Sequence, residues 1–304
     1  MTRNELETLA RRCDLDGIGA VPAQPIPADA ERVAARVLGP LPPELAYLAR
    51  SLPRRLDPRL VLPEVRSMVV AMLSYAGPQP GVEARPPGHA FVSRFAWSRD
   101  YHDAVGARMA RLADELSQAT GARTRWYVDT GPVLEKAWAA AAGLGFVGRN
   151  ALLVSPRFGS FVFLGVVLAE AELEATGPGP ASGCEGCRAC VEACPTGALD
   201  GDGGLDPNRC LAHWNAGART PVPDALAAHL GGNLYGCDLC QDACPWNARA
   251  ERPDRPEFRP LPGLWMPRID DVLAMDADGF DRAFGLTPVR RRGLELLKST
   301  ALML

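Results

Sequence analysis

Short apolar runs along the first half of the chain predict strands. Met68–Leu73 (MVVAML) has the pattern of a buried strand, and Thr124–Val128 (TRWYV) that of another. Asn150–Val154 and Ser160–Leu168 predict a hairpin that turns at Arg157-Phe158-Gly159. Strand signals therefore recur from about residue 68 to residue 168.

Helical periodicity appears between these strands. Apolar residues at positions 105, 109, 112 and 116 are spaced for one helix face, and Gly121 is a natural stop. An alanine-rich segment, Val133–Ala142, predicts a second helix that ends at Gly143. The tail, Pro288–Leu304, also has an apolar helical pattern. Strands mixed with helices predict an α/β or α+β domain over the first half of the chain.

Glycine and proline divide the chain into segments. The stretch Glu174–Gly183 (EATGPGPASG) predicts a domain boundary. We expect a catalytic domain over residues 1–175, a loop-rich cysteine domain over 176–250 and a helical tail over 251–304. The 304 residues suit about two domains, because domains average roughly 150 residues.

Composition narrows the class of protein. Hydrophobic residues make up 47% and charged residues 23%, which is ordinary globular composition and excludes wholesale disorder. The N-terminus, Met1–Arg12, lacks the apolar core of a signal peptide, and the apolar stretch Phe161–Ala169 is too short to span a bilayer. We therefore expect a soluble cytoplasmic protein, in whose reducing compartment clustered cysteines favour metal binding over disulfides.

Eight of the nine cysteines fall between residues 184 and 244 and form two related runs. The second run repeats the Cys-x2-Cys-x3-Cys-Pro spacing of the first at an offset of 50 residues. The first run has the full bacterial ferredoxin spacing, Cys-x2-Cys-x2-Cys-x3-Cys-Pro. In that pattern three cysteines hold one [4Fe–4S] cluster, and the fourth ligates the other cluster.

This exchange predicts two clusters with four ligands each. The first cluster takes Cys184, Cys187, Cys190 and Cys244, and the second takes Cys194, Cys237, Cys240 and the remaining nearby cysteine, Cys210. Zinc and disulfides are the alternatives, but zinc sites usually show two cysteine pairs per metal. Cys13 is isolated and is expected to be a small buried residue.

Three polar segments upstream of the cysteines are candidates for chemistry: RFAWSRDYH (94–102), DTGPVLEK (129–136) and GLGFVGRN (143–150). Each also has a structural interpretation. Asp129 could cap a helix, and the glycines could be turn residues. Arg99 and Asp100 could form a surface ion pair, and His102 could be structural.

Together, the motifs RDYH, VDTGPVLEKAWA, AGLGFVGRNALL, GSFVFLG and YGCDLCQDACPWN resemble epoxyqueuosine reductase over about residues 50 to 250. The resemblance implies a cobalamin-dependent oxidoreductase with two [4Fe–4S] clusters that reduces the epoxide of epoxyqueuosine at the tRNA wobble position to the alkene of queuosine. It also implies an α+β fold whose cobalamin-binding domain is nitroreductase-like, as in reductive dehalogenases. A monomer, an external low-potential electron donor and the tRNA anticodon loop as substrate are implied as well.

Site residues follow from the same resemblance. Asp129 is the implied proton donor, and that role requires its pKa to be raised, as burial beside an apolar corrin would do. The implied cobalamin contacts are Arg94, Asp129, Gly148, Arg149, Asn150, Cys237 and Asp238, the last two through the backbone. Arg149 stands where the family often has lysine, and the two side chains are not interchangeable.

Two departures from the family pattern keep other functions open. Residues 210–217 read CLAHWNAG, which lacks the family's Thr-Ile-Glu segment, and the chain ends at Leu304 without the helical-repeat extension of longer members. The first departure favours a related corrinoid/iron–sulfur reductase of a small molecule, with dehalogenation as one reaction. An electron carrier is the third hypothesis.

Charge adds one requirement for a tRNA substrate. The formal charge is −3; eight ligating thiolates would add eight negative charges and two [4Fe–4S]2+ cores would return four positive ones, giving roughly −7. Binding an RNA backbone then needs a local basic patch. The best candidates are the runs Arg54-Arg55-Arg59 and Arg290-Arg291-Arg292, which could equally be solvated surface charges.

Overall fold

The computed structural model describes residues 1–25, 33–77 and 85–304. The chain forms two compact units. The first comprises Met1–Ser74, His102–Gly148 and Leu152–Glu185, and the second comprises Tyr75–Tyr101, Arg149–Ala151 and Gly186–Leu304. The domain boundaries expected near residues 175 and 250 stay a prediction.

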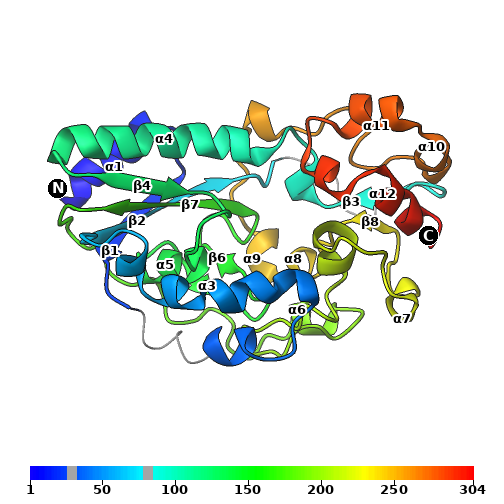
Figure 1. Ribbon diagram of the computed structural model, residues 1–304, viewed down its shortest axis with the longest axis horizontal. Coiled ribbons are helices and arrows are strands. Elements are labelled where there is room, and N and C mark those ends of the chain that lie inside the picture. The colour runs from blue at the N-terminus through cyan, green and yellow to red at the C-terminus, as the bar shows by residue number, and fades with distance from the viewer. Residues whose placement is uncertain (26–32, 78–84) are drawn as a thin grey trace. The chain divides into compact units, whose positions relative to one another are not determined.

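An antiparallel sheet is the centre of the first unit (Figure 1). Its strand order is β1-β2-β7-β4, and every neighbouring pair is antiparallel. The strands are β1 (Gly17–Pro22), β2 (Ser67–Ser74), β7 (Val162–Ala169) and β4 (Thr124–Tyr127). With helices around an antiparallel sheet, the fold class is α+β, as predicted. The predicted strands at 68–73 and 124–128 are confirmed.

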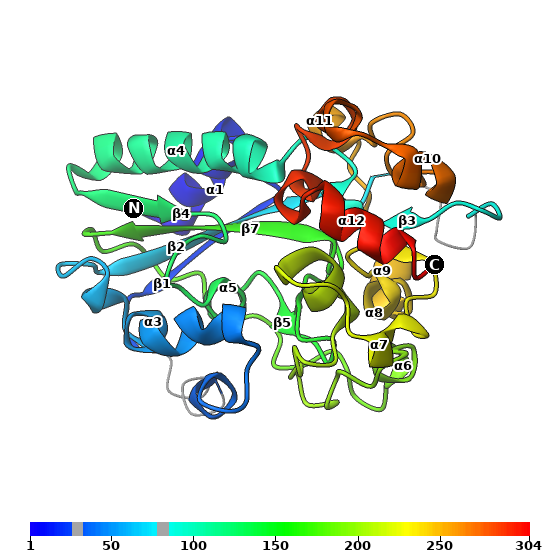
Figure 2. The same ribbon diagram turned by 45° about the vertical axis from the view of Figure 1, so that its right-hand side comes forward.

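Helices cover both faces of this sheet (Figures 1 and 2). On one face lie α1 (Arg3–Arg12) and α4 (Tyr101–Thr120). On the other lie α3 (Ala46–Leu56) and α5 (Glu135–Ala141). The short 3-10 helices Pro43–Leu45 and Pro58–Leu60 flank α3.

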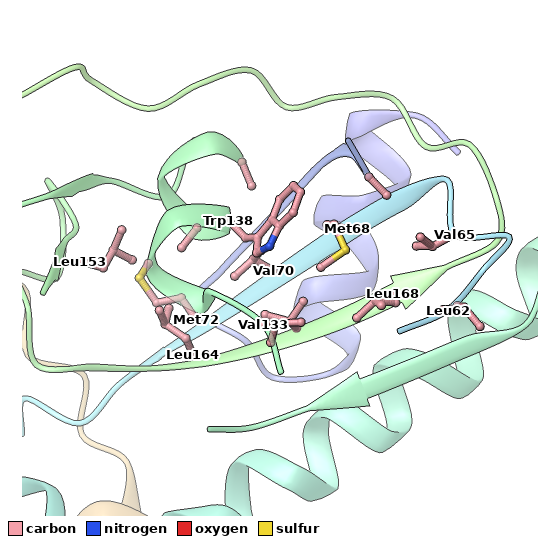
Figure 3. Packing of buried hydrophobic residues seen from close by; sticks show 14 of the residues in the cluster. Leu62, Val65, Met68, Val70, Met72, Val133, Trp138, Leu153, Leu164 and Leu168 are labelled. Carbon is pink, nitrogen blue, oxygen red and sulfur yellow. The ribbon is translucent and has the colours of Figure 1, made fainter. Parts of the chain in front are cut away.

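The two-residue repeat of β2 places alternate side chains in the core between the sheet and α5. Met68, Val70 and Met72 of β2 point to the α5 side, where they pack with Trp138 and Val133 (Figure 3). The intervening β2 residues are also fully buried, which explains the uninterrupted apolar run of this central strand. The packing of Val133 and Trp138 fixes the start of α5 against the sheet.

Glycines end both predicted helices of the first unit. Gly121 follows α4 with φ +69° and Gly143 follows α5 with φ +88°, a left-handed conformation that favours glycine. The helices predicted around residues 105–116 and 133–142 are therefore confirmed, with their predicted stops.

The predicted hairpin is wrong. β6 (Leu153–Val154) pairs with β5 (Phe146–Val147), whereas β7 pairs with β2 and β4. Only Ser155 and Gly159 bridge across the expected turn. The apolar side chains of β7 gain more burial in the central sheet than a local hairpin could give them.

Many short elements make up the second unit. They are β3 (Phe91–Val92), α6 (Ala189–Glu192), the π-helix His213–Gly217, α7 (Asp224–Ala227), β8 (Asn233–Tyr235), α8 (Leu239–Asp242), α9 (Pro245–Ala248), α10 (Ile269–Ala274), α11 (Ala277–Phe284) and α12 (Leu294–Ala301), with 3-10 helices at Arg94–Ala96, Pro256–Phe258 and Pro288–Arg292. β3 and β8 pair in parallel. The predicted helix in the tail is confirmed by α12.

One core joins the tail to the β3–β8 pair. Trp97 and Phe91 pack with Leu234 of β8 and with Phe284 and Leu297 of the tail. Burial of these side chains from distant parts of the sequence stabilises this unit. In the described ranges, no helix is long and apolar enough to cross a membrane.

Candidate functional site

Asp129 lies at the tip of a tight turn after β4. Its φ is +54°, and the backbone N–H of Thr130 donates to the carbonyl of Val128 at 2.6 Å, which closes a three-residue turn. Val128 is buried, whereas Asp129 is exposed. A non-glycine residue held at positive φ stores backbone strain, and such strain clusters at functional sites.

Packing on either side holds this turn. A Cβ at Gly131 would lie 2.3 Å from Cγ of Tyr127, so only glycine fits beside that ring. Arg55 of α3 donates from Nη1 to the carbonyl of Val133 at 3.1 Å and from Nε to Ser51 at 2.9 Å. The cap of α5 is Leu134, so Asp129 does not cap this helix.

Glu135, the first residue of α5, has an unusual carboxyl group. Its Oε1 is buried and makes no hydrogen bond within the described residues. Burial, followed by the negative charge of Asp129, raises the pKa of Glu135 to about 7. Its own backbone N–H, Arg55 and Lys136 act in the opposite direction. At neutral pH this carboxyl therefore holds a proton for much of the time.

Lys136 completes the charged group around Asp129. Solvent reaches its side chain, but protein surrounds it closely enough that desolvation lowers the pKa of its ammonium. Glu135 and Asp129 partly offset that effect. The segment 129–136 thus holds two carboxyls and one cation, and Arg55 of α3 adds a second cation.

All nine cysteines are free thiols, which excludes the disulfide alternative. Cys13 is buried at 1% exposure, as expected. The described residues contain no group of His, Cys, Asp or Glu spaced to hold a single metal ion. An iron–sulfur cube holds its four cysteines farther apart than one ion does, because each thiolate binds a different iron.

The four thiols predicted to hold the second cluster influence one another. Burial and then, after Asp238, the thiols of Cys210 and Cys194 raise the pKa of Cys237 to about 12. Burial raises the pKa of Cys240 still more strongly, and the thiols of Cys237, Cys210 and Cys194 raise it further. Cys210, which stands outside both runs, therefore contributes to the electrostatic environment of Cys237 and Cys240.

Hydrogen-bond donors surround Cys194. The backbone N–H of Ala198 donates to its Sγ at 3.3 Å, and the Thr196 hydroxyl lies 3.6 Å away. Burial opposes the thiolate, but these hydrogen bonds outweigh it and lower the pKa of Cys194. A preformed set of donors suits a thiolate that ligates iron.

Arg94 and Asp238, both predicted cobalamin contacts, bind each other inside the second unit. Asp238 is 1% exposed and accepts from Arg94 Nη1 at 3.1 Å, from the Arg94 backbone N–H at 2.9 Å and from the Ser93 hydroxyl. Arg94 also donates to Asp242 at 2.6 Å. This buried pair fixes the loop that carries Cys237.

Arg149 holds the first cysteine run in a similar way. Its Nη1 donates to the carbonyl of Cys187 at 2.9 Å, and Cys187 corresponds to Cys237 in the repeat. Next to it, Asn150 is buried, and Gly148 in the first unit donates from its backbone N–H to Leu152. These predicted cobalamin contacts stay a prediction.

The segment that departs from the family pattern is structural at one position. Asn215 is fully buried; its amide donates to the carbonyls of Asn233 and Gly236 at 3.0 and 2.9 Å and accepts from the Gly236 N–H at 2.9 Å. Because Gly236 precedes Cys237, Asn215 positions a predicted cluster ligand. It lies in a π-helix, a local irregularity common at functional sites.

The two arginine runs do not form two open basic patches. Arg292 is 3% exposed and donates to the carbonyl of Ala218, and Arg291 pairs with Asp100. Asp100 therefore pairs with Arg291 of the tail. In the other run, Arg59 pairs with Asp57 at 2.8 Å, and Arg55 is used as described above. The prediction of a three-arginine patch at 290–292 is wrong.

Comparison with known proteins decides the family. Residues 55–130 match the family described as Epoxyqueuosine reductase QueG, DUF1730. The epoxyqueuosine reductase of Gloeobacter violaceus is 42% identical over 254 residues, covering 83% of this chain and 78% of that protein. That of Synechocystis is 36% identical and covers 85% of this chain and 89% of that protein. This chain belongs to the epoxyqueuosine reductase family.

Solved structures agree with the assignment to the epoxyqueuosine reductases. A crystal structure of epoxyqueuosine reductase with an epoxyqueuosine-modified tRNA-Tyr stem loop matches with a TM-score of 0.88 and 29% identity, covering 99% of this chain and 80% of that one. The Bacillus subtilis enzyme, with its catalytic aspartate loop swung out of the active site, matches with a TM-score of 0.84 and 27% identity over the same shares.

The cysteine segment matches a 4Fe–4S double cluster binding domain over residues 183–247. This match covers all eight cysteines predicted as ligands, so this member of the family binds two iron–sulfur clusters rather than zinc. The partition of the eight thiols between the clusters stays a prediction.

Sequence reasoning missed several residues of the site. Glu135 and Lys136 lay in a segment singled out for Asp129, and their charge and spacing gave no role by themselves. Arg55 was read only as part of a basic run. Asn215 appeared only as a departure from the family. Burial sets the properties of Glu135 and Lys136, and contacts with other segments set the roles of Arg55 and Asn215, so only the folded chain shows them.

Proposed function

We propose that this chain is a tRNA epoxyqueuosine reductase that uses cobalamin and two [4Fe–4S] clusters. The observation that carries the proposal is Asp129, presented at the tip of a strained, braced turn in a chain that also holds a double-cluster domain. The family assignment and the similarity to a reductase solved with its tRNA stem loop support it.

The reaction has a fixed balance of electrons and protons. An epoxide, two electrons and two protons give an alkene and one water, as both carbon–oxygen bonds break and the carbon–carbon double bond forms. The clusters pass electrons singly, so two in series can deliver the pair. Protein groups must supply the protons where the oxygen departs.

Asp129 gives the departing oxygen its first proton. Exposure lets its carboxyl reach a substrate, and the turn closed by Thr130 limits where that carboxyl can lie. A fixed position matters because general acid catalysis requires hydrogen-bond reach to the oxygen that is protonated. Gly131 and Arg55 hold the turn in this conformation.

Cobalamin, when bound, would supply strongly reducing cobalt chemistry at the site. The residues that would hold it are Arg94, Asp129, Gly148, Arg149 and Asn150, with the backbone of Cys237 and Asp238. Their chemistry fits a corrin rimmed with amides, because guanidinium, amide and backbone groups donate and accept hydrogen bonds. Arg149 uses one of its five N–H groups for Cys187.

Two ligand sets follow from the reciprocal ferredoxin pattern. We assign Cys184, Cys187, Cys190 and Cys244 to one cluster. The other cluster takes Cys194, Cys210, Cys237 and Cys240, whose thiols influence one another. The buried contacts of Arg94 and the contact of Arg149 with Cys187 hold the two runs in place for cluster assembly.

We further propose that the enzyme is a cytoplasmic monomer that receives electrons from an external low-potential donor and binds the anticodon loop of its tRNA. The two arginine runs offer few open cations, so exposed Arg54 and Arg290 are the members of these runs that can meet phosphates.

Anaerobic turnover tests the function. The chain, reconstituted with iron, sulfide and cobalamin, is incubated with a chemical reductant and an epoxyqueuosine-containing tRNA stem loop. We expect the modified nucleoside to lose one oxygen atom by mass spectrometry. If the nucleoside stays intact while the same preparation reduces a halogenated phenol, the small-molecule reductase is the correct function instead.

A further inference from the structure

The turn that follows Cys194 places two hydrogen-bond donors beside its sulfur. The backbone N–H of Ala198 donates to Sγ at 3.3 Å, and the Thr196 hydroxyl oxygen lies 3.6 Å from the same atom. Gly197, at φ +59°, turns the chain between them, and its N–H donates to the Cys194 carbonyl at 3.1 Å. Thr196 and Ala198 are both buried, so protein excludes most water from these contacts.

The Thr196 hydroxyl has one possible role once Cys194 ligates iron. In a free thiol, either the sulfur or the hydroxyl can give the proton of this contact. A thiolate bound to iron carries no proton, so the hydroxyl must donate and the sulfur must accept. The resulting hydrogen bond is charge-assisted, and it strengthens as the sulfur becomes more negative.

The second cysteine run repeats the first but differs at these positions. Trp246 stands where the first run has Thr196, and tryptophan has no hydroxyl. The N–H of Ala248, which corresponds to Ala198, donates to the carbonyl of Cys244 at 3.3 Å as part of a helical turn. The hydroxyl contact therefore belongs to only one of the two corresponding Cys-Pro turns, and its effect should be confined to one cluster.

Reduction changes the charge that this hydrogen bond meets. Four thiolates and a [4Fe–4S]2+ core leave about two net negative charges, and one electron from the external donor raises this to about three while the donor is oxidised by one electron. A donor beside a ligating sulfur stabilises the more negative form more strongly. Hydrogen bonds to the sulfurs therefore raise the reduction potential of a cluster.

We propose that Thr196 is a positioning residue that raises the reduction potential of the cluster ligated by Cys194, through the hydrogen bond from its hydroxyl to the Cys194 sulfur. The bond makes this cluster hold an incoming electron more firmly. In the partition given above, this is also the cluster of Cys237, beside the implied cobalamin contacts. Only that last placement rests on the proposed function.

A redox titration of the full chain with both clusters loaded tests the proposal. Electron paramagnetic resonance follows the reduced clusters as the potential is lowered and gives a midpoint for each. Thr196→Val keeps the branched shape but removes the hydroxyl, so we expect the electron equilibrium of one cluster to shift about tenfold toward the oxidised form, or about 59 mV. The other midpoint should stay unchanged. Thr196→Ser keeps a hydroxyl and should keep most of the wild-type midpoint.

Thr287 offers a matched control in the same unit. It is also buried, and its hydroxyl donates to the carbonyl of Phe284 at 2.9 Å and not to a sulfur. Thr287→Val should leave both midpoints unchanged. Unchanged midpoints in Thr196→Val at full iron content, an equal shift of both clusters, or the same shift in Thr287→Val would overturn the proposal. Loss of a cluster in both Thr196→Val and Thr196→Ser would also overturn it, because the residue would then serve assembly alone.

Proton electron–nuclear double resonance observes the hydrogen bond itself. In the reduced wild-type chain we expect a coupled proton near the cluster that exchanges in D2O. The same signal should be present in Thr196→Ser and missing in Thr196→Val. Its persistence in Thr196→Val would show that the hydroxyl is not its source.

Neither measurement contains cobalamin or tRNA, which separates this inference from the proposed function. A shifted midpoint in Thr196→Val, together with a wild-type chain that leaves epoxyqueuosine intact, would refute the proposed function and leave the role of Thr196 in place. An unshifted midpoint in a chain that does form the alkene would refute the role of Thr196 alone.

Discussion

The carboxyl groups of segment 129–136 and those of the loop around Cys237 differ in burial and hydrogen bonding. In the first, Asp129 is exposed on a strained turn, and Glu135 keeps a buried carboxyl oxygen that accepts no hydrogen bond from the described residues. In the second, Asp238 is buried under three hydrogen bonds, and Asn215 makes two hydrogen bonds to Gly236 and one to Asn233. Proton transfer needs groups that change their protonation state, whereas electron transfer needs ligands that stay fixed. The two regions have the physical properties of these two tasks.

Removing the Asp129 proton should have the largest effect. We expect Asp129→Asn to lower kcat about 100-fold or more, because general acid catalysis commonly contributes 10²–10⁴-fold. Asparagine tolerates positive φ, so the turn should persist. The measurement is steady-state conversion of epoxyqueuosine tRNA, with iron content and visible spectrum as checks on the clusters.

Asp14 provides the matched control for this change. It also has φ +54°, and its carboxylate pairs with Arg108 at 2.6 Å. Asp14→Asn should leave kcat unchanged. An equal loss in both variants would mean that distortion at a positive-φ aspartate, and not proton donation, lowers the rate.

Cys210 tests the proposed ligand set of the second cluster. We propose Cys210 as the fourth ligand of the second cluster, so replacing it by serine should lower iron from about eight to about four atoms per chain and remove one of two cluster signals by electron paramagnetic resonance. Cys13→Ser should keep the full iron content, since Cys13 lies outside the group. Full iron in Cys210→Ser would refute the ligand assignment.

Arg94 tests whether the second region depends on fixed charge pairs. Arg94→Gln leaves the buried Asp238 without its cation, and we expect a loss of about 3–5 kcal/mol in the free energy of unfolding. Arg66→Gln breaks an exposed pair with Glu172 and should change it little. Anaerobic urea unfolding measures both, and equal costs would count against a structural role for the buried pair.

The smallest expected effect is on stability as a function of pH. The folded pKa of Glu135 is raised to about 7 from an ordinary 4.5, so its contribution is fully present below 4.5 and is lost as pH rises through about 7. The loss is at most about 3 kcal/mol and smaller where solvent reaches the side chain. Glu135→Gln should flatten this part of the curve of unfolding free energy against pH. A curve that stays parallel to wild type would contradict the raised pKa.

The sequence predicts best what short-range pattern controls. The strand before Asp129, the helix after it and the cluster motifs all depend on spacing within about ten residues, and each is confirmed. The hairpin at 150–168 was wrong because β7 gains its burial by pairing with β2, which lies some 95 residues earlier. The Arg55 contact with Val133 and the Arg94 pair with Asp238 also join distant segments, and no local pattern encodes them.

A single turnover without an external donor tests the central division of labour most directly. The chain is loaded with both clusters and cobalamin, reduced, freed of reductant and mixed with the epoxyqueuosine stem loop, and cluster oxidation and product are measured in the same frozen samples. For wild type we predict two electrons lost for each alkene formed. For Asp129→Asn we predict clusters that reduce normally but are oxidised, with alkene formed, about 100-fold more slowly or slower still. Equal cluster oxidation and alkene formation in the variant would contradict the account.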